Sequence, residues 1–251
     1  MDLGLADRVY VLTGASRGLG FATAQALVAD GARVVVSART PSAVEAAVAA
    51  LGPAHAAGLP ADLGAPDTAE RLVELAQTRF GRLDGALVSV GGPSFGGVLE
   101  MPESAWLDSF QTIFLGTLRL CQVVADAIGS VPEGEDAALA LVLSSSVRVP
   151  LDRLAISNGL RPGLAGLAKD LSNELGPRGI RVLSLLPGKV LTDRNLLASA
   201  GDPAGAVQSI PLRRGADPAE FGRVAAFVLS PAASYLTGIA LPVDGGAIRA
   251  I

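Results

Sequence analysis

Short apolar runs that alternate with helix-length segments constrain this chain more than any other feature of its sequence. Six runs have the length of strands, at 8–13, 33–37, 85–90, 139–145, 181–187 and 240–244. The first five are apolar without regular alternation, which is typical of strands covered on both faces of a parallel sheet. The sequence therefore predicts an α/β fold with a buried sheet.

Helices are expected between these strands, at roughly 17–30, 41–51, 66–79, 103–128, 160–176 and 217–229. This order, with right-handed crossovers, gives a doubly wound, mostly parallel sheet with helices on both faces. The length fits a single domain, 1–251. The stretch at about 192–215 has no clear periodicity and is expected to form a lid over a site.

The composition excludes several classes of function. The formal net charge is -4 and the basic residues are scattered, so we expect a small-molecule partner and neither nucleic acid nor a membrane. Cys121 is the only cysteine and His55 the only histidine, which argues against a disulfide framework, a zinc or other metal site and a Ser-His-Asp triad. No signal sequence or membrane span is visible, and a cytoplasmic protein is expected.

The motif TGASRGLG, at 13–20, lies directly after the first strand and begins the first helix. Gly14 allows a tight turn, Gly18 lets a pyrophosphate approach the backbone, and Gly20 lets the helix pack closely on the strand. The positive end of the helix then faces the phosphates. The sequence predicts a nucleotide site at this turn.

Three further motifs follow in order: LPG at 186–188, IPLRRGADPAEFG at 210–222 and YLTGIALPVDGG at 235–246. With TGASRGLG they make the chain resemble the short-chain dehydrogenase/reductase family over essentially its whole length. It is most similar to members like the β-ketoacyl carrier-protein reductases. The resemblance implies a Rossmann-like sheet of seven parallel strands, a nicotinamide cofactor, and a homotetramer or homodimer.

The glycine motif and the resemblance together give a set of cofactor-binding residues: Gly14, Ser16, Arg17, Gly18, Leu19, Gly20, Ser37, Arg39, Asp62, Leu63, Gly91, Pro187, Gly188, Lys189 and Thr192. NAD-preferring members place an acidic residue after the second strand, where this chain has Ser37 and Arg39. Arg39 and Arg17 could clasp a 2′-phosphate, which favours NADP, with NAD possible. The alternatives are that both arginines are solvated surface residues and that Asp62 is a turn or capping residue.

Several positions depart from the family pattern. The usual NNAG is replaced by VSVG at 88–91, and Ile113 stands where the resemblance implies an active-site Asn. The serine that hydrogen-bonds the substrate carbonyl is retained, with Ser145 the best match and Ser146 the next.

The family's Tyr-x-x-x-Lys pair is also missing. The resemblance places Ile156 at the Tyr and Leu160 at the Lys. A shift of one residue would give Ser157 and Arg161 the same spacing, but it rotates a side chain by about 100° around a helix. Because Asn158 and Gly159 are poor helix formers and Pro162 favours a first turn, the regular helix is expected to begin only near Arg161.

These features favour an NADP-dependent oxidoreductase that acts on a carbonyl or alcohol with a non-standard active site. Ser145 or Ser146 would polarise the carbonyl, and Arg161 or water would supply part of what Tyr and Lys normally do. Lys189 is a further candidate for the missing ammonium, with a surface role as its alternative. The alternative functions are a noncatalytic cofactor-binding subunit, or a lyase or isomerase on the same scaffold.

Overall fold

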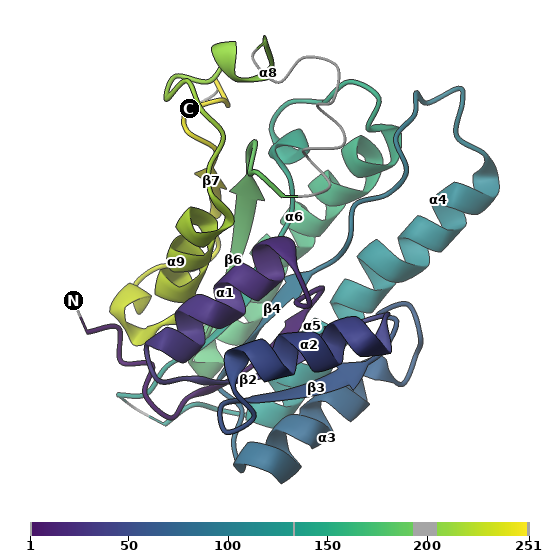
Figure 1. Cartoon of the computed structure of the whole chain (residues 1–251). Coiled ribbons are helices and arrows are strands. Elements are labelled where there is room, and N and C mark those ends of the chain that lie inside the picture. Colours follow the sequence, from purple (N-terminus) through teal and green to yellow (C-terminus); the bar gives the residue numbers. More distant parts are fainter. Residues whose placement is uncertain (1, 133, 193–204, 250–251) are drawn as a thin grey trace.

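The computed structural model describes residues 2–132, 134–192 and 205–249. The strands in this part of the chain are β1 Val9–Thr13, β2 Arg33–Ala38, β3 Ala56–Pro60, β4 Gly85–Ser89, β5 Ala137–Val142, β6 Ile180–Pro187 and β7 Ala240–Val243. They form one seven-stranded parallel sheet in the order β3-β2-β1-β4-β5-β6-β7 (Figure 1). The strand order reverses between β1 and β4, so a crevice for a ligand is expected outside their carboxyl ends.

Helices cover both faces of this sheet. The main helices are α1 Gly18–Ala29, α2 Pro41–Leu51, α3 Thr68–Phe80, α4 Glu103–Ser109, α5 Gly116–Ile128, α6 Ala155–Leu175, α8 Gly205–Gln208 and α9 Pro218–Leu229. In Figure 1, α1 and α2 lie in front of the sheet with α9 beside α1, and their apolar residues form one half of the core. The other half lies under α3, α5 and α6. The predicted doubly wound Rossmann-like fold is confirmed.

Strand β3 is the one strand in the described residues that the apolar runs did not predict. Its sequence, AAGLP, contains a glycine because α2 passes directly over it. A Cβ on Gly58 would lie 2.5 Å from Val44 Cγ1 and 2.8 Å from Val48 Cγ2. Close packing against the helix therefore requires a residue with low strand propensity at this position.

The prediction that regular helix begins only near Arg161 is wrong, because α6 begins at Ala155. The Asn158 side chain donates to the Leu151 carbonyl at 2.8 Å and accepts the Leu151 N–H at 3.0 Å. The backbone N–H of Asn158 donates to the Leu154 carbonyl at 2.8 Å. Pro162 lies one turn further and removes only one intrahelical hydrogen bond. Tertiary contacts thus outweigh the weak helix propensity of these residues.

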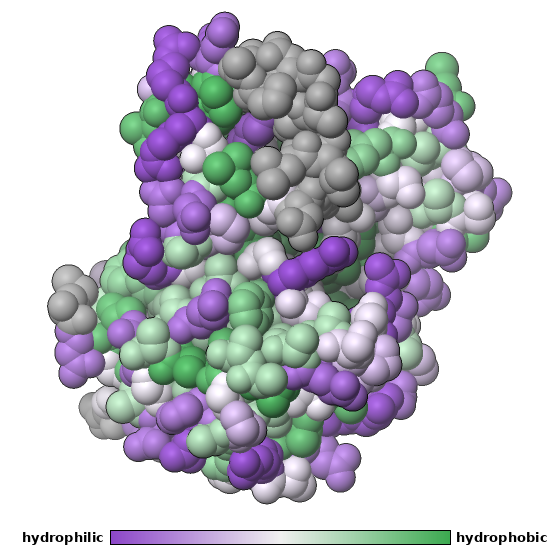
Figure 2. Space-filling model, in the orientation of Figure 1, coloured by the Kyte–Doolittle hydropathy of each residue, from purple (hydrophilic) through white to green (hydrophobic). Residues whose placement is uncertain are grey.

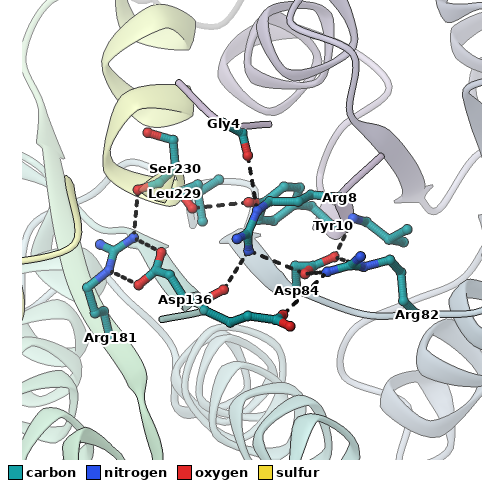
Figure 3. Close-up of polar contacts among 11 residues, drawn as sticks. Gly4, Arg8, Tyr10, Arg82, Asp84, Asp136, Arg181, Leu229 and Ser230 are labelled. Carbon is teal, nitrogen blue, oxygen red and sulfur yellow. Dashed lines mark hydrogen bonds and ion pairs between the residues drawn. The ribbon is translucent and has the colours of Figure 1, made fainter. Parts of the chain in front are cut away.

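A set of polar side chains, buried and half-buried apart from the exposed Arg82, closes the amino end of the sheet, and we call it the amino-end network (Figure 3). It consists of Arg8, Tyr10, Arg82, Asp84, Asp136 and Arg181. Arg181 and Asp136 form two parallel hydrogen bonds of 2.7 Å. The remaining Arg181 donors bind the carbonyls of Val228, Leu236 and Ser230.

Asp84 connects the rest of the amino-end network. It accepts the backbone N–H of Val9 at 2.8 Å and binds the guanidinium groups of Arg8 and Arg82. The hydroxyl of Tyr10 donates to the Leu229 carbonyl at the end of α9, and burial raises the Tyr10 pKa well above its ordinary value. These side chains join the beginnings of the central strands to the last turn of α9.

Candidate functional site

The glycine turn predicted from TGASRGLG connects β1 to α1 at the carboxyl end of the sheet. Gly14 and Gly18 have positive φ angles of 58° and 59°, which favour glycine. A Cβ on Gly14 would lie 2.5 Å from the Ser89 carbonyl oxygen, and one on Gly20 would lie 2.6 Å from the Gly14 carbonyl oxygen. The turn is therefore a closely packed cradle in which these glycines have no room for side chains.

Two exposed arginines lie at this cradle. Arg17 is the N-cap residue of α1, and its side chain makes no capping hydrogen bond. Arg39 follows β2, whose Ser37 is buried and accepts the Ala15 N–H at 3.0 Å through its carbonyl. Figure 2 shows a narrow strip of hydrophilic atoms across pale and hydrophobic surface where α1 begins. The glycine turn and the end of β2 are thus joined by a hydrogen bond, and each carries an exposed cation.

The remaining predicted residues of the nucleotide site vary in exposure. Ser16 and Leu19 are half-buried in the turn. Asp62 is exposed, and its carboxylate accepts the Gly64 N–H at 2.8 Å, which is the turn role considered as an alternative. Leu63 packs its side chain into the core, so a ligand would meet its backbone. Gly91 is exposed, and a Cβ there would meet nothing within 4 Å.

The segment after β6 reaches the glycine turn from the other side. A Cβ on Gly18 would lie 3.6 Å from Thr192 Cγ2, so these two predicted residues are neighbours. Gly188 follows the half-buried Pro187 and passes close to β7, because a Cβ there would lie 2.6 Å from the Asp244 Cα. The predicted lid at 192–215 lies partly outside the described residues.

Lys189 follows the PG turn after β6, and its carbonyl accepts the Ala216 N–H at 2.9 Å. It lines an open hollow of about 850 Å³ on the α9 side of β7, together with Arg214, Glu220 and Asp244. The predicted catalytic residues do not line this hollow.

Two buried serines meet at the carboxyl end of β5. Ser146 Oγ lies 3.1 Å from Ser157 Oγ, and each residue is only 3% exposed. The backbone N–H of Ser146 is held by Ser144 Oγ at 3.1 Å, whereas Ser145 is half-exposed. Of the two predicted serines, Ser146 is the one that contacts α6. Ser157 was not among the predicted site residues, although its spacing to Arg161 was visible in the sequence.

Arg161 lies one turn after Ser157 on α6 and is 6% exposed. One guanidinium nitrogen donates to the Val142 carbonyl at 2.8 Å, and the other donates to the Val90 carbonyl at 3.5 Å. These carbonyls belong to the ends of β5 and β4. Arg161 therefore places a fixed positive charge where the two strands end.

The orientation of α6 distinguishes the two possible pairs. Ser157 hydrogen-bonds Ser146 in the turn after β5, and Arg161 binds the Val142 carbonyl. Ile156 is fully buried and Leu160 is half-buried. Ile113 is also buried and lies in a π-helical turn, Phe110–Leu115. The polar side chains that α6 directs toward the site are therefore those of Ser157 and Arg161.

The two tyrosines lie far from these serines. Tyr10 belongs to the amino-end network, and Tyr235 is fully exposed just before β7, also at the amino end of the sheet. Burial raises the pKa of Cys121 to about 12, so its thiol is inert in the core. In the described ranges we find no group of acidic, cysteine or histidine side chains that could hold a metal ion.

Comparison with known proteins places these features in context. Residues 14–247 match the family model described as Enoyl-(Acyl carrier protein) reductase. An uncharacterized oxidoreductase of Methylorubrum extorquens is 35% identical over 250 residues, which cover 96% of this chain and 98% of the relative. The 3-oxoacyl-[acyl-carrier-protein] reductase FabG of Escherichia coli is 29% identical, covering 95% of this chain and 96% of FabG.

Solved structures are similar along the whole chain. A short-chain dehydrogenase/reductase of Brucella melitensis, described as a glucose/ribitol dehydrogenase, has a TM-score of 0.93 and 30% identity, with complete coverage of both chains. The L-sorbose reductase of Gluconobacter frateurii, solved with NADPH and L-sorbose, has a TM-score of 0.89 and 26% identity, also with complete coverage. No helix in residues 2–132, 134–192 and 205–249 has the length and apolarity needed to cross a membrane.

Proposed function

The chain belongs to the short-chain dehydrogenase/reductase family of oxidoreductases, and on this premise we propose that it transfers a hydride between NADP(H) and the carbonyl or alcohol group of a small molecule. The observation that carries this proposal is the glycine cradle with Arg17 and Arg39 beside it. A homodimer or homotetramer is part of the proposal, because it is common in the family.

The residues of the cradle fit a dinucleotide. Side chains are excluded at Gly14 and Gly20, which leaves the backbone N–H groups of the first turn of α1 to meet a pyrophosphate. Thr192 lies against Gly18, so the segment after β6 would contact the same ligand from the opposite side. Pro187 and Gly188 would lie beside the nicotinamide half.

Charge favours NADP over NAD at this site. The positions after β2 carry Arg39 and no carboxylate, whereas binding of the ribose 2′-hydroxyl in NAD sites usually uses an acidic residue. Arg39, with Arg17 at the start of α1, can hydrogen-bond a phosphate bidentately. We propose that the two guanidinium groups hold the 2′-phosphate.

The nicotinamide supplies the hydride when it is bound, and the protein must hold the substrate and manage the proton. Ser146 lies at the end of β5, where the family's substrate-binding serine is expected. We propose that its hydroxyl polarises the carbonyl and that Arg161 binds the ribose of the nicotinamide half. This active site operates without the family's Tyr and Lys.

Titration with NADPH and NADH, followed by nicotinamide fluorescence, tests the cofactor assignment. Arg39→Ala should weaken NADPH binding about 10- to 100-fold, the loss expected for a charged hydrogen bond, and leave NADH binding unchanged. Arg33→Ala is the matched control, because Arg33 lies at the opposite end of the same strand and pairs with Asp7. Equal affinity for NADH and NADPH would contradict the phosphate clasp, and no binding of either would overturn the proposed function.

A second candidate is a cofactor-binding subunit that does not catalyse. It is favoured by the polar face of α6, whose Ser157 and Arg161 are poor proton donors. Tight NADPH binding without reduction of any carbonyl compound would support this candidate.

A further inference from the structure

Ser157 carries a buried hydroxyl beside the predicted site, and the proposed function leaves it without a role. Its Oγ lies 3.1 Å from Ser146 Oγ, and both atoms are placed by regular structure. Ser157 lies in the first turn of α6, and Ser146 lies in the 3₁₀ turn Ser145–Val147. The pair is therefore positioned by two elements rather than by a loose loop.

The hydrogen-bonding capacity of this pair leaves one proton for a ligand. Each hydroxyl has one donor and two acceptor sites, and the contact between them uses only one of the two protons. Because both residues are 3% exposed, water competes little with a hydrogen bond made there. A carbonyl oxygen is an acceptor of the required kind.

Arg161 adds a positive charge to the same face of α6. It is held by the carbonyls of Val142 and Val90, and an arginine keeps its charge at every physiological pH. A fixed positive charge near a carbonyl stabilises the negative charge that develops on oxygen during reduction. Arginine cannot pass a proton to the hydroxyls, as a lysine could.

From these contacts we propose that Ser157 is a catalytic residue, which with Ser146 binds the substrate oxygen, and that the site suits carbonyl groups activated by electron-withdrawing neighbours. This proposal rests on the proposed function. The carbonyl carbon receives a hydride from the reduced nicotinamide, which becomes oxidised, and the oxygen receives a proton from the Ser157 hydroxyl. Water then returns a proton to Ser157, so the ketone takes up one hydride and one proton in total.

The choice of substrate follows from the weak acidity of serine. Without an acidic donor, negative charge builds up on the oxygen before the proton arrives. Electron-withdrawing substituents stabilise that charge, whereas loss of a positioned acid typically slows the reduction of an ordinary ketone about 10²- to 10⁴-fold. A trifluoromethyl ketone should therefore react much faster than the matching methyl ketone.

The charged residues around this pair predict that the rate does not depend on pH in the neutral range. Neighbouring elements carry Arg148 and Asp152, which are exposed, and the ion pair between Arg153 and Glu100. Arg161 is the charged residue on α6 itself at this point. None of these residues is a histidine or a cysteine, the side chains that most often change charge near neutral pH.

Kinetics with NADPH test the proposal on two probes, acetophenone and 2,2,2-trifluoroacetophenone. The wild type should reduce the trifluoro compound at least about 100-fold faster, with a flat kcat/KM between about pH 6 and 9. Ser157→Ala should lower kcat/KM about 10- to 1,000-fold without changing NADPH affinity. Ser157→Thr keeps a hydroxyl and should retain more activity than Ser157→Ala.

The matched control is Ser172→Ala on the same helix. Ser172 is 5% exposed and donates to the Lys169 carbonyl, so it is also a buried hydroxyl, but it lies in the last turn of α6. This variant should keep wild-type kinetics. A similar loss in both variants would show that the effect is a general loss of α6 stability, and it would overturn the assignment of Ser157.

A second measurement does not depend on turnover. With NADP⁺ bound, the ¹⁹F resonance of 2,2,2-trifluoroacetophenone should broaden on binding to the wild type and to Ser172→Ala, but not to Ser157→Ala. Equal broadening in all three would overturn the role of Ser157. NADPH binding without reduction of either ketone would also overturn it and leave the cofactor site intact, whereas absence of NADPH binding would reject the proposed function itself.

Discussion

At the amino end of the sheet the charged side chains bind one another and the backbone, whereas at the carboxyl end Arg17 and Arg39 face solvent. Arg181 is 5% exposed and donates hydrogen bonds to the Asp136 carboxylate and to three backbone carbonyls. The same residue type therefore has two uses in one molecule. Arginines at the amino end hold strands and α9 together, and those at the carboxyl end are available to a ligand.

This contrast separates the residues that hold the sheet and α9 together from those of the candidate site. The amino-end network and the two halves of the core do not involve Ser146 or Ser157. Substitutions at the two ends should accordingly affect different measurements.

The largest effect on stability is expected for Arg181→Ala. Removing this guanidinium leaves Asp136 as a buried, unpaired charge, which should lower the free energy of unfolding by about 3–5 kcal/mol. Urea denaturation measures the loss, and NADPH affinity should stay unchanged while the protein is folded. Arg33→Ala removes an exposed ion pair at the same end and should cost no more than about 1 kcal/mol. Equal losses in the two variants would contradict the contrast.

A smaller effect is expected for Asn158→Ala, at the carboxyl end. This change removes both hydrogen bonds to the Leu151 backbone and should cost about 1–2 kcal/mol. Amide hydrogen exchange should become faster at Leu151, and ketone reduction should fall, because the loop between Ser146 and Ser157 loses its attachment. Asn173→Ala, an exposed position on the same helix, should change neither. Unchanged exchange at Leu151 would show that the loop is held by other contacts.

The smallest effect is expected for Glu220→Gln, which breaks an exposed ion pair near the carboxyl end. A hydrogen bond from Arg214, followed by one from the Asp217 N–H, lowers the Glu220 pKa to about 2. The carboxylate therefore stabilises the fold above its unfolded-state pKa of about 4.3, and this contribution disappears as the pH falls toward 2.

The wild type should have a slightly higher urea midpoint than Glu220→Gln at pH 7, and the difference should shrink as the pH falls toward about 3. Glu74→Gln, at an exposed position on α3, should match the wild type at each pH. A difference that grows on acidification would contradict the direction of the Glu220 shift.

The sequence predicted most of the fold because burial on both faces leaves uninterrupted apolar runs, as in β4 and β5. It failed at β3 because packing against α2 requires Gly58. It also failed at the start of α6. There Asn158 forms hydrogen bonds with the preceding loop, and helix propensity takes no account of such tertiary contacts.

The candidate site was predicted in part. The glycine turn could be predicted because local sterics require glycine at each of these positions. The sequence indicated Ser157 only through its spacing to Arg161. The rotation of α6 that directs Ser157 toward Ser146 depends on packing along the whole helix. Lys189 lines a hollow with residues of α9 and β7, which its position beside the PG turn did not indicate.

Trp106, the only tryptophan of the chain, lies against the same turn of α6. A Cβ on Gly159 would lie 2.8 Å from Trp106 Cζ3, so the indole packs on the helix two residues after Ser157. Its fluorescence therefore reports on one place in the molecule without any label. Energy transfer to a reduced nicotinamide and changes in the packing of α6 both become visible in the emission of a single residue.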